Sequence, residues 1–276
     1  MDSMKIDYKE QEEFWNERAK VKDERKAVTL VSSPYFARYI DQNQKREILN
    51  AYKVGRDMRV LDLGCGNGRW SIKFAENCAE VVGIDISQKL INVAQKKAKE
   101  KNLNNIKFIK GLIINLPQLG KKFDMVFFGW VLMYLNEKDV ENILEKITQY
   151  LKEDYAAVVL DSFSLKCRKI TKSKKDYSAI YRAPKELITT FSRHGFKLVY
   201  RKDISLICIP NVIYTRLVPS NIKEKKLIQL LFKSSLTIQL YLNPLLYKIK
   251  PIVRVSQYLK RKFSGISHQV LVFNMK

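Results

Sequence analysis

The chain has 276 residues, 46% of them hydrophobic, which suits one domain with elaborations and excludes an intrinsically disordered chain. Four cysteines without a CxxC pair and only two histidines argue against a structural zinc site and a disulfide framework. The net charge of +23 is uneven, because residues 151–276 hold 25 Lys and Arg residues against 7 Asp and Glu residues. The second half is therefore expected to meet an anionic partner.

The first 54 residues are expected to form a helical cap. Residues 8–27 are highly charged with few aromatic positions, which predicts an exposed or loosely docked helix. Ser33 and Pro34 form a helix start signal, so a second helix is expected over about residues 35–53. The acidic N-terminal stretch predicts no signal peptide, and no uncharged apolar run reaches the roughly 18 residues of a spanning helix. We therefore expect a cytoplasmic protein and leave association with a membrane surface open.

From about residue 58, short apolar runs alternate with amphipathic segments. Strands are expected over residues 58–64, 79–86, 105–111, 123–130, 155–163, 197–205 and 268–276. Helices are expected between them, over residues 68–78, 87–102, 137–152 and 184–196. This alternation predicts an α/β fold with a doubly wound, mainly parallel sheet. The basic loop 166–175 and a long insertion over about 207–265 interrupt it.

The stretch "VLDLGCGNG", residues 60–68, places three glycines directly after the first predicted strand. Such a turn lets backbone N–H groups approach a ligand, and it exposes the positive end of the following helix. In a doubly wound sheet it lies at the carboxyl edge, where ligands bind. Asp62 precedes the glycines, and Asp85 ends the next strand, where a carboxylate can hold both ribose hydroxyls of a nucleoside.

These motifs together resemble the class I S-adenosylmethionine-dependent methyltransferases. "VLDLGCGNG" is similar to the family's first motif, "VVGIDIS" to its second, and "FDMVFFGWVLMYL" to its fourth-strand motif. The resemblance spans about residues 55–205 and implies a seven-stranded sheet whose last strand is antiparallel. We accordingly divide the chain into an N-terminal helical cap (1–54), a Rossmann-like core (55–206 plus 266–276) and a basic amphipathic insertion before the last strand (207–265).

The resemblance implies S-adenosylmethionine as the cofactor and a role for the first two motifs. Backbone groups of Gly64, Cys65 and Gly66 would wrap its methionine part, and Asp62 would help to hold the amino group. Asp85 would bind the ribose. The other implied contacts are Ile86 on the adenine, the turn Gly111–Leu112 at the adenine edge, and Gly129 and Trp130 beside the sulfonium and the acceptor.

One position departs from the family's pattern. Many members carry an acid after the glycine of the third motif, where this chain has Leu112. We therefore expect the adenine amino group to be recognised by backbone groups or by Asn115.

Two further groups are candidates for the acceptor site. Tyr177, Tyr181 and Arg182 follow the fifth predicted strand and its basic loop, in a region that covers the acceptor pocket in the family. Tyr35 and Arg38 begin the second predicted helix, and Arg38 is a candidate for binding the cofactor's carboxylate. A surface loop with packed tyrosines fits the first group equally well. No catalytic base is assigned, and no metal is expected.

The insertion is both basic and aliphatic. Residues 221–262 contain ten Lys and Arg residues and one acid, Glu224, interleaved with Leu, Ile, Phe and Tyr. This composition suits a helix at an anionic bilayer interface, and it equally suits a helical subdomain with a solvated basic rim. A nucleic-acid site would be less aliphatic. The sequence thus predicts methyl transfer to a small-molecule or lipid- or glycan-linked acceptor; the alternatives are an RNA methyltransferase and a non-catalytic cofactor-binding subunit with a basic partner-binding face.

Overall fold

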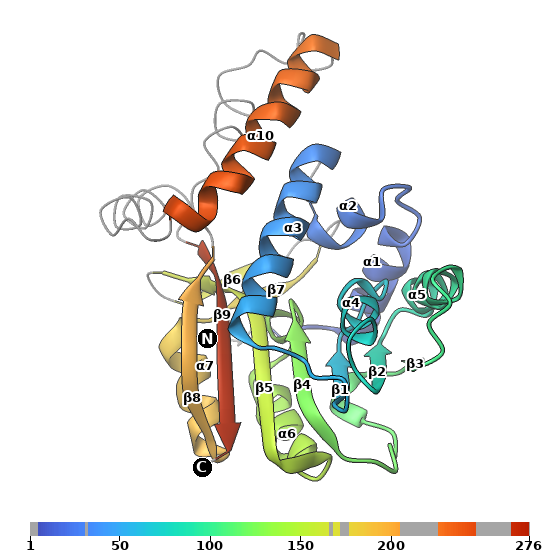
Figure 1. The fold of residues 1–276 in the computed structure, drawn as a ribbon. Helices are drawn as coiled ribbons and strands as arrows, with labels where there is room; N and C mark the ends of the chain where they lie inside the picture. Colours follow the sequence, from blue (N-terminus) through green and yellow to red (C-terminus); the bar gives the residue numbers. More distant parts are fainter. Residues whose placement is uncertain are drawn as a thin grey trace.

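The computed structural model describes residues 5–30, 33–165, 168–171, 177–204, 226–246 and 266–275. Its centre is a seven-stranded sheet of order β3-β2-β1-β4-β5-β9-β8 (Figure 1). The strands are β1 (Arg59–Leu63), β2 (Glu80–Asp85), β3 (Ile106–Lys110), β4 (Phe123–Gly129), β5 (Leu151–Ser164), β8 (Phe196–Asp203) and β9 (Ile266–Met275). Strands β1 to β5 pair in parallel, whereas β9 is antiparallel to both neighbours. The predicted sheet with its antiparallel last strand is therefore confirmed.

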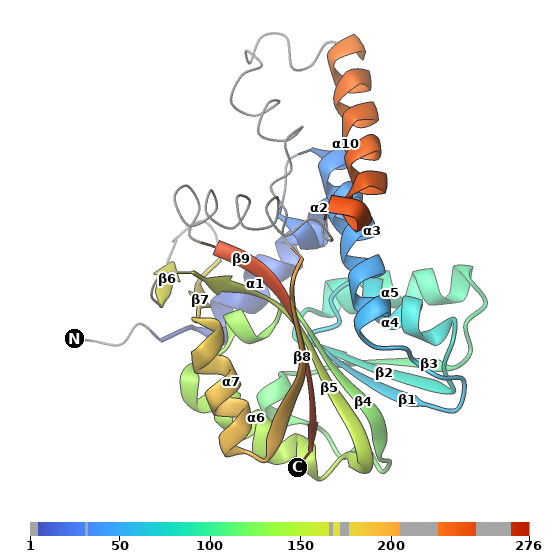
Figure 2. The ribbon, with the colours of Figure 1, turned by 60° about the vertical axis from the view of Figure 1, so that its left-hand side comes forward.

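Helices cover both faces of this sheet. On one face lie α3 (Pro34–Ala51), α4 (Arg69–Ala75) and α5 (Gln88–Glu100), and on the other lie α6 (Glu137–Thr148) and α7 (Pro184–Arg193) (Figure 2). Successive residues of β5 alternate between the two cores: Val158 packs with α3 and α4, and Val159 packs with α6 and α7. Burial on both faces explains why the central strands are continuous apolar runs in the sequence.

The N-terminal segment differs from the expected loosely docked helix over residues 8–27. It forms two helices, α1 (Tyr8–Arg18) and α2 (Glu24–Thr29), because Asp7 and Asp23 each cap a new helix by accepting backbone N–H bonds. Helix α1 is also firmly docked, since Asn136 Oδ1 accepts from the N–H of Ile6 at 2.7 Å just before it. The second predicted helix is confirmed as α3, which begins at Pro34 with Ser33 as its cap.

Two elements lie outside the doubly wound core. Strands β6 (Lys169–Thr171) and β7 (Ala179–Tyr181) form a small antiparallel sheet between β5 and α7, which the sequence did not predict. Helix α10 (Lys226–Leu246) is the described part of the predicted insertion, and it packs on α3 through Leu236 and Tyr39. The rest of that insertion lies outside the described residues. Of the helices that the structure describes, none combines the length and the apolar character that a membrane crossing requires.

Candidate functional site

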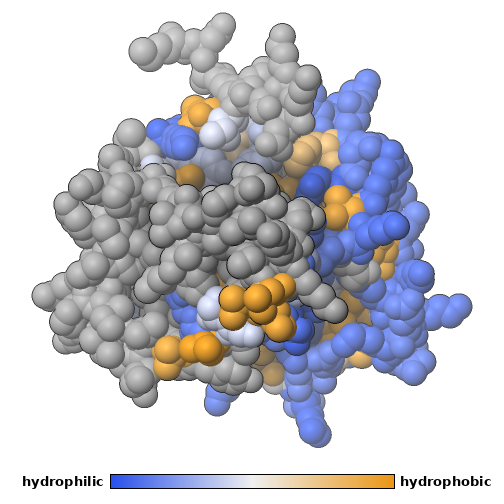
Figure 3. Space-filling model, turned by 90° about the horizontal axis from the view of Figure 1, so that it is seen from above, coloured by the Kyte–Doolittle hydropathy of each residue, from blue (hydrophilic) through white to orange (hydrophobic). Residues whose placement is uncertain are grey.

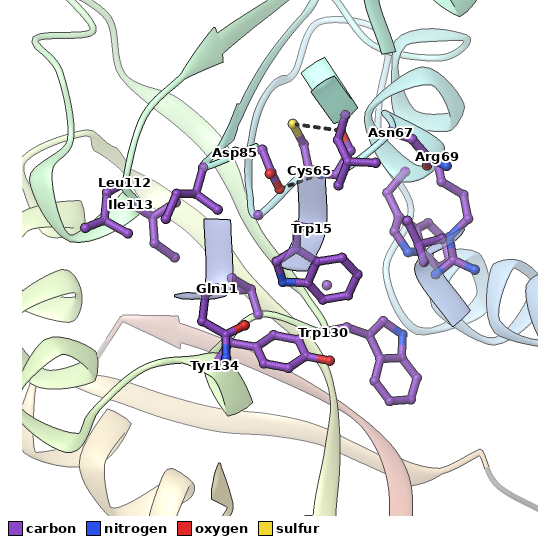
Figure 4. A pocket seen from close by; sticks show the side chains of 18 of the residues that line it. Gln11, Trp15, Cys65, Asn67, Arg69, Asp85, Leu112, Ile113, Trp130 and Tyr134 are labelled. Carbon is purple, nitrogen blue, oxygen red and sulfur yellow. Dashed lines mark hydrogen bonds between the residues drawn. The ribbon is translucent and has the colours of Figure 1, made fainter. Parts of the chain in front are cut away.

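A cavity opens at the carboxyl ends of β1, β2 and β4 and holds about 830 Å³ of empty space, part of it open to solvent (Figure 4). It lies where the order of the sheet reverses between β1 and β4, which is the usual ligand site of such folds. The structure brings eight of the predicted site residues to its wall: Gly64, Cys65, Gly66, Asp85, Ile86, Leu112, Gly129 and Trp130.

The glycine loop has a backbone that other residues would strain. Gly64, Gly66 and Gly68 have φ angles of 78°, 54° and 73°, which L side chains rarely adopt. At Gly64 a Cβ atom would also lie 2.5 Å from Val131 Cγ2, and at Gly68 it would lie 2.9 Å from Ala94 Cβ. The loop therefore needs glycine both for its conformation and for its close packing, and at Gly66 it presents bare backbone to the cavity.

Asp85 is the buried carboxylate of the cavity wall. Its Oδ2 accepts from the Gly66 N–H and its Oδ1 from the Ser87 N–H, each at 2.8 Å, so that the loop and the start of α5 orient it. Burial raises its pKa to about 6, against the lowering effect of these two bonds. Each oxygen keeps a further lone pair, so the group can accept two hydroxyl donors from a sugar.

Asp62 lies behind the glycine loop, in the core of the sheet edge, and does not line the cavity. Ser71 Oγ donates to its Oδ2 at 2.5 Å. Burial raises its pKa to about 7, and the nearby Asp85 charge adds to this effect. The structure thus places Asp62 where it supports the loop and α4 from beneath.

Other predicted residues lie beside the cavity or away from it. The N–H of Gly111 donates to the carbonyl oxygen of Asp85 at 2.9 Å, which sets the turn that carries Leu112 to the wall. Asn115, at the end of the short helix η1 (Ile113–Asn115), does not line the cavity. Arg38 is exposed and Tyr35 packs with Tyr39 and Leu236, and neither reaches the cavity wall.

The cation at the cavity wall is Arg69 rather than the expected Arg38. Arg69 is the first residue of α4, and Asp41 Oδ1 and Gln44 Oε1 of α3 each accept from its Nη1 at 3.1 Å. Its guanidinium also stacks over the Trp70 ring, 5.0 Å from the ring centre. Its place directly after the third glycine is a sequence signal that could have identified it, since that position begins the helix facing the ligand.

Helix α1 forms the opposite wall with Tyr8, Gln11 and Trp15, none of which the sequence indicated. Gln11 is buried, and its Nε2 donates to the carbonyl oxygen of Ser178 at 2.7 Å. This bond leaves Oε1 of Gln11 buried without a hydrogen-bond partner among the residues that the structure describes. A buried acceptor in that state favours a ligand with a hydrogen-bond donor.

A closed circle of four aromatic rings holds α1 over the cavity. Phe14 and Trp15 contact each other (ring centroids 5.0 Å apart), Trp15 contacts Tyr134 (5.4 Å), and Tyr177 contacts both Tyr134 and Phe14 (5.7 Å each). Tyr134 belongs to the short helix η2 (Leu132–Tyr134), and Tyr177 precedes β7. The circle therefore joins three segments that are distant in sequence.

The predicted acceptor residues Tyr177, Tyr181 and Arg182 lie behind this wall and do not line the cavity. The hydroxyls of Tyr177 and Tyr181 are 3.0 Å apart. Arg182 is buried, and its guanidinium donates to the carbonyl oxygens of Leu132 (2.7 Å) and Leu135 (2.8 Å). These three residues hold η2 and the aromatic circle in place.

Trp130, at the end of β4, has a φ of 59°, which is rare for a residue with a bulky side chain. Its N–H donates to the carbonyl oxygen of Leu160 at 2.7 Å, which fixes this turn. Its ring contacts the imidazole of His268 (ring centroids 4.7 Å apart), whose Nδ1 lies 3.0 Å from Ser162 Oγ. His268, which the sequence left without a role, thus supports the cavity wall from behind.

Comparisons with known proteins agree with this geometry. A family model described as a methyltransferase domain matches residues 55–207. Demethylmenaquinone methyltransferase from Listeria welshimeri is 31% identical over 121 residues, and the one from Geobacillus kaustophilus is 30% identical over 121 residues. Each match covers 43% of this chain, and the chain spans about half the length of these curated relatives.

Solved structures share the fold at low sequence identity. An O-methyltransferase from a polyketide synthase multienzyme of Brevibacillus brevis is 17% identical, with a TM-score of 0.61 over 93% of this chain and 79% of that chain. Phosphoethanolamine N-methyltransferase 1 from Haemonchus contortus is 21% identical, with a TM-score of 0.60 over 75% and 46%. The cyclase SpnF is 15% identical, with a TM-score of 0.55 over 85% and 80%. The chain therefore belongs to the methyltransferase-domain family and has the fold of the class I S-adenosylmethionine-dependent methyltransferases.

Proposed function

We propose that this chain transfers a methyl group from S-adenosylmethionine to a small-molecule or lipid- or glycan-linked acceptor. The observation that carries the proposal is the presence, in one cavity, of the bare glycine loop and the buried carboxylate of Asp85. The family match supports the transferase chemistry. The relatives named as demethylmenaquinone methyltransferases support a quinone precursor as one acceptor of this class.

The cavity residues fit the parts of this cofactor. Asp85 offers acceptor oxygens for the ribose hydroxyls, and Ile86, Leu90 and Leu112 form an apolar slot beside it for the adenine ring. Gly64 and Gly66 would lie against the methionine part, and the Arg69 guanidinium is the cation of the wall for its carboxylate. Adenine discrimination would then rest on shape and on backbone groups of the 111–113 turn.

The cofactor supplies a methyl group bonded to a positively charged sulfur. When the acceptor takes the methyl group in an in-line displacement, the carbon–sulfur bond breaks and the sulfur leaves as a neutral thioether. The chain's own task is to position the two reactants and to keep water out, and positioning alone can supply much of the acceleration. Gly129 and Trp130 line the wall at the end of β4, shortly before the helix η2 that carries Tyr134 of the aromatic circle. They would separate the cofactor's part of the cavity from the acceptor's part.

Cofactor binding is the first measurement, because a cyclase shares this fold and the fold alone does not determine the reaction. We expect calorimetry to show one site for S-adenosylmethionine and for S-adenosylhomocysteine. Asp85→Ala should weaken both by at least about tenfold, since it removes charged acceptors of two hydroxyls. The matched control is Asp154→Ala, which removes an exposed carboxylate at the start of β5. Equal affinity in the two variants would refute the assignment of Asp85.

Transfer is then tested with a radiolabelled methyl group. Purified protein is incubated with the labelled cofactor and separate lipid, small-molecule and RNA fractions of a cell extract. We expect label in a small-molecule or lipid fraction, and none with Asp85→Ala. Label in RNA would establish the RNA methyltransferase instead, and binding without transfer into any fraction would establish the non-catalytic subunit.

We also propose that the protein works at an anionic membrane surface. The charge of residues 151–276 and the mixed basic and aliphatic composition of residues 221–262 support this proposal. A lipid-linked acceptor would then be reached from the surface in which it is embedded.

A further inference from the structure

The exposed apolar side chains of the described residues are concentrated on one helix. Seven large hydrophobic side chains are exposed, and five of them belong to α10: Leu227, Leu230, Leu231, Ile238 and Leu242. Their exposed fractions lie between 46% and 65%. Isolated exposed hydrophobic residues are ordinary, but a group on a single element indicates a binding surface.

These five side chains share one face of α10. At about 100° per residue, positions 227, 230, 231, 238 and 242 fall within an arc of about 120°. Leu236, which is 2% exposed, lies on the opposite side of the helix, where it contacts Tyr39 of α3, and the buried Gln239 lies between this side and the arc. One face thus fixes the helix to the molecule, and the other presents aliphatic side chains outward.

The charged residues in and around α10 are mostly positive, which favours an anionic partner. Helix α10 contains no Asp or Glu, and Lys233 is exposed beside the aliphatic arc. Across residues 221–262, ten of the eleven charged residues are Lys or Arg. Aliphatic side chains that enter a headgroup layer, flanked by cations, are the combination that an anionic bilayer binds, each cation near the surface adding about 1 kcal/mol.

The helix also lies on the side of the molecule that holds the cavity. It projects past the carboxyl ends of the parallel strands, next to the upper part of α3 (Figure 1, Figure 2). Viewed from that end, apolar patches stand beside hydrophilic surface (Figure 3). Helix α10 and the cavity therefore lie toward the same end of the molecule.

We propose that the aliphatic face of α10, formed by Leu227, Leu230, Leu231, Ile238 and Leu242, binds the interface of an anionic lipid bilayer. The helix lies flat in the headgroup region and does not cross the membrane. Binding itself does not depend on the reaction, whereas delivery of a lipid-linked acceptor to the cavity rests on the proposed methyl transfer.

The test is cosedimentation with phosphatidylcholine vesicles that contain either no anionic lipid or 30% phosphatidylglycerol. We expect the wild-type chain to bind only the anionic vesicles and to dissociate with rising salt. The triple variant Leu227→Gln, Leu231→Gln and Ile238→Gln should bind at least about tenfold more weakly. The control changes Ile170 and Val199 to Gln, because these two side chains are also exposed (43% and 51%) but lie outside α10. Equal binding by all three proteins, or none by the wild type, would overturn the proposal.

A second measurement reports insertion directly. Leu231→Trp should be quenched by brominated anionic lipids beyond the level of the native tryptophans, whereas Val199→Trp should not. If the triple variant instead converts a wild-type dimer to a monomer without any effect of lipid, the face is a subunit interface and the proposal is wrong. Cofactor binding by calorimetry on the same variants separates the two proposals, since it should stay unchanged when only the membrane surface is lost.

Discussion

At the scale of single residues, burial rather than ion pairing governs the acids around the cavity. Burial raises the pKa of Asp62 from 3.8 to about 7. Between these two pH values the native chain binds more protons at this site than the unfolded chain does. Asp62 therefore contributes stability below about pH 4 that is progressively lost as the pH rises to 7.

The loss of stability with rising pH leads to a measurable prediction for Asp62→Asn. The variant cannot titrate, so its free energy of unfolding should fall less between pH 4 and pH 7 than that of the wild type. The difference in slope can reach about 1.4 kcal/mol per pH unit, which corresponds to one proton. Urea denaturation at several pH values measures both slopes, with Asp154→Asn as the exposed control. Parallel curves for wild type and Asp62→Asn would contradict the raised pKa.

The places of the glycine loop and of Asp85 at the cavity wall could be predicted, because each lies in a short motif at the end of a strand. The geometry of the loop depends on strand β1 and the start of α4, and that of Asp85 depends on the N–H groups of Gly66 and Ser87. Arg69 belongs to the same stretch, but the sequence does not show that α3 would supply its partners, Asp41 and Gln44. The structure shows that Arg38 faces outward while Asp41, one turn further on α3, holds Arg69.

At the scale of elements, α1 shows what the sequence could not provide. Its buried residue is the polar Gln11, and its charges surround the helix, so no apolar stripe indicated a docked face. Its residues Tyr8, Gln11 and Asn16 form hydrogen bonds with three other parts of the chain, at Asn136, Ser178 and Ser87 respectively. The central strands β1, β2, β4 and β5, in contrast, are recognisable locally because each is buried along most of its length.

The aromatic circle predicts how α1 can be loosened. Tyr177→Ala removes the ring contacts to Phe14 and Tyr134, each worth about 0.5–1.5 kcal/mol. We expect amide hydrogen exchange in α1 to become at least about fivefold faster, because the helix opens more often. Affinity for S-adenosylmethionine should fall as well, since Trp15 and Gln11 leave the wall with α1.

Tyr177→Phe is the matched variant, because it keeps the ring and loses only the hydroxyl next to Tyr181. Its α1 exchange should equal that of the wild type. Exchange in β8, at the far edge of the sheet, should be unchanged in both variants. If the alanine variant left α1 as protected as before, the circle would not be what holds the helix down.

At the scale of the whole molecule, the sheet edge, α1, η1 and η2 all contribute to the wall of one cavity, so a bound ligand stabilises them together. A ligand that contacts all of them binds only the folded chain, so it raises the free energy of unfolding by about 2.7 kcal/mol at a hundredfold excess over its Kd. For a chain of this size we expect S-adenosylhomocysteine at that excess to raise the melting temperature by roughly 5 °C. Differential scanning calorimetry measures the shift, and Asp85→Ala should abolish most of it. NAD is the control ligand, because its pyrophosphate needs the longer glycine spacing that this loop lacks; a shift with NAD but not with S-adenosylhomocysteine would assign the cavity to a dinucleotide.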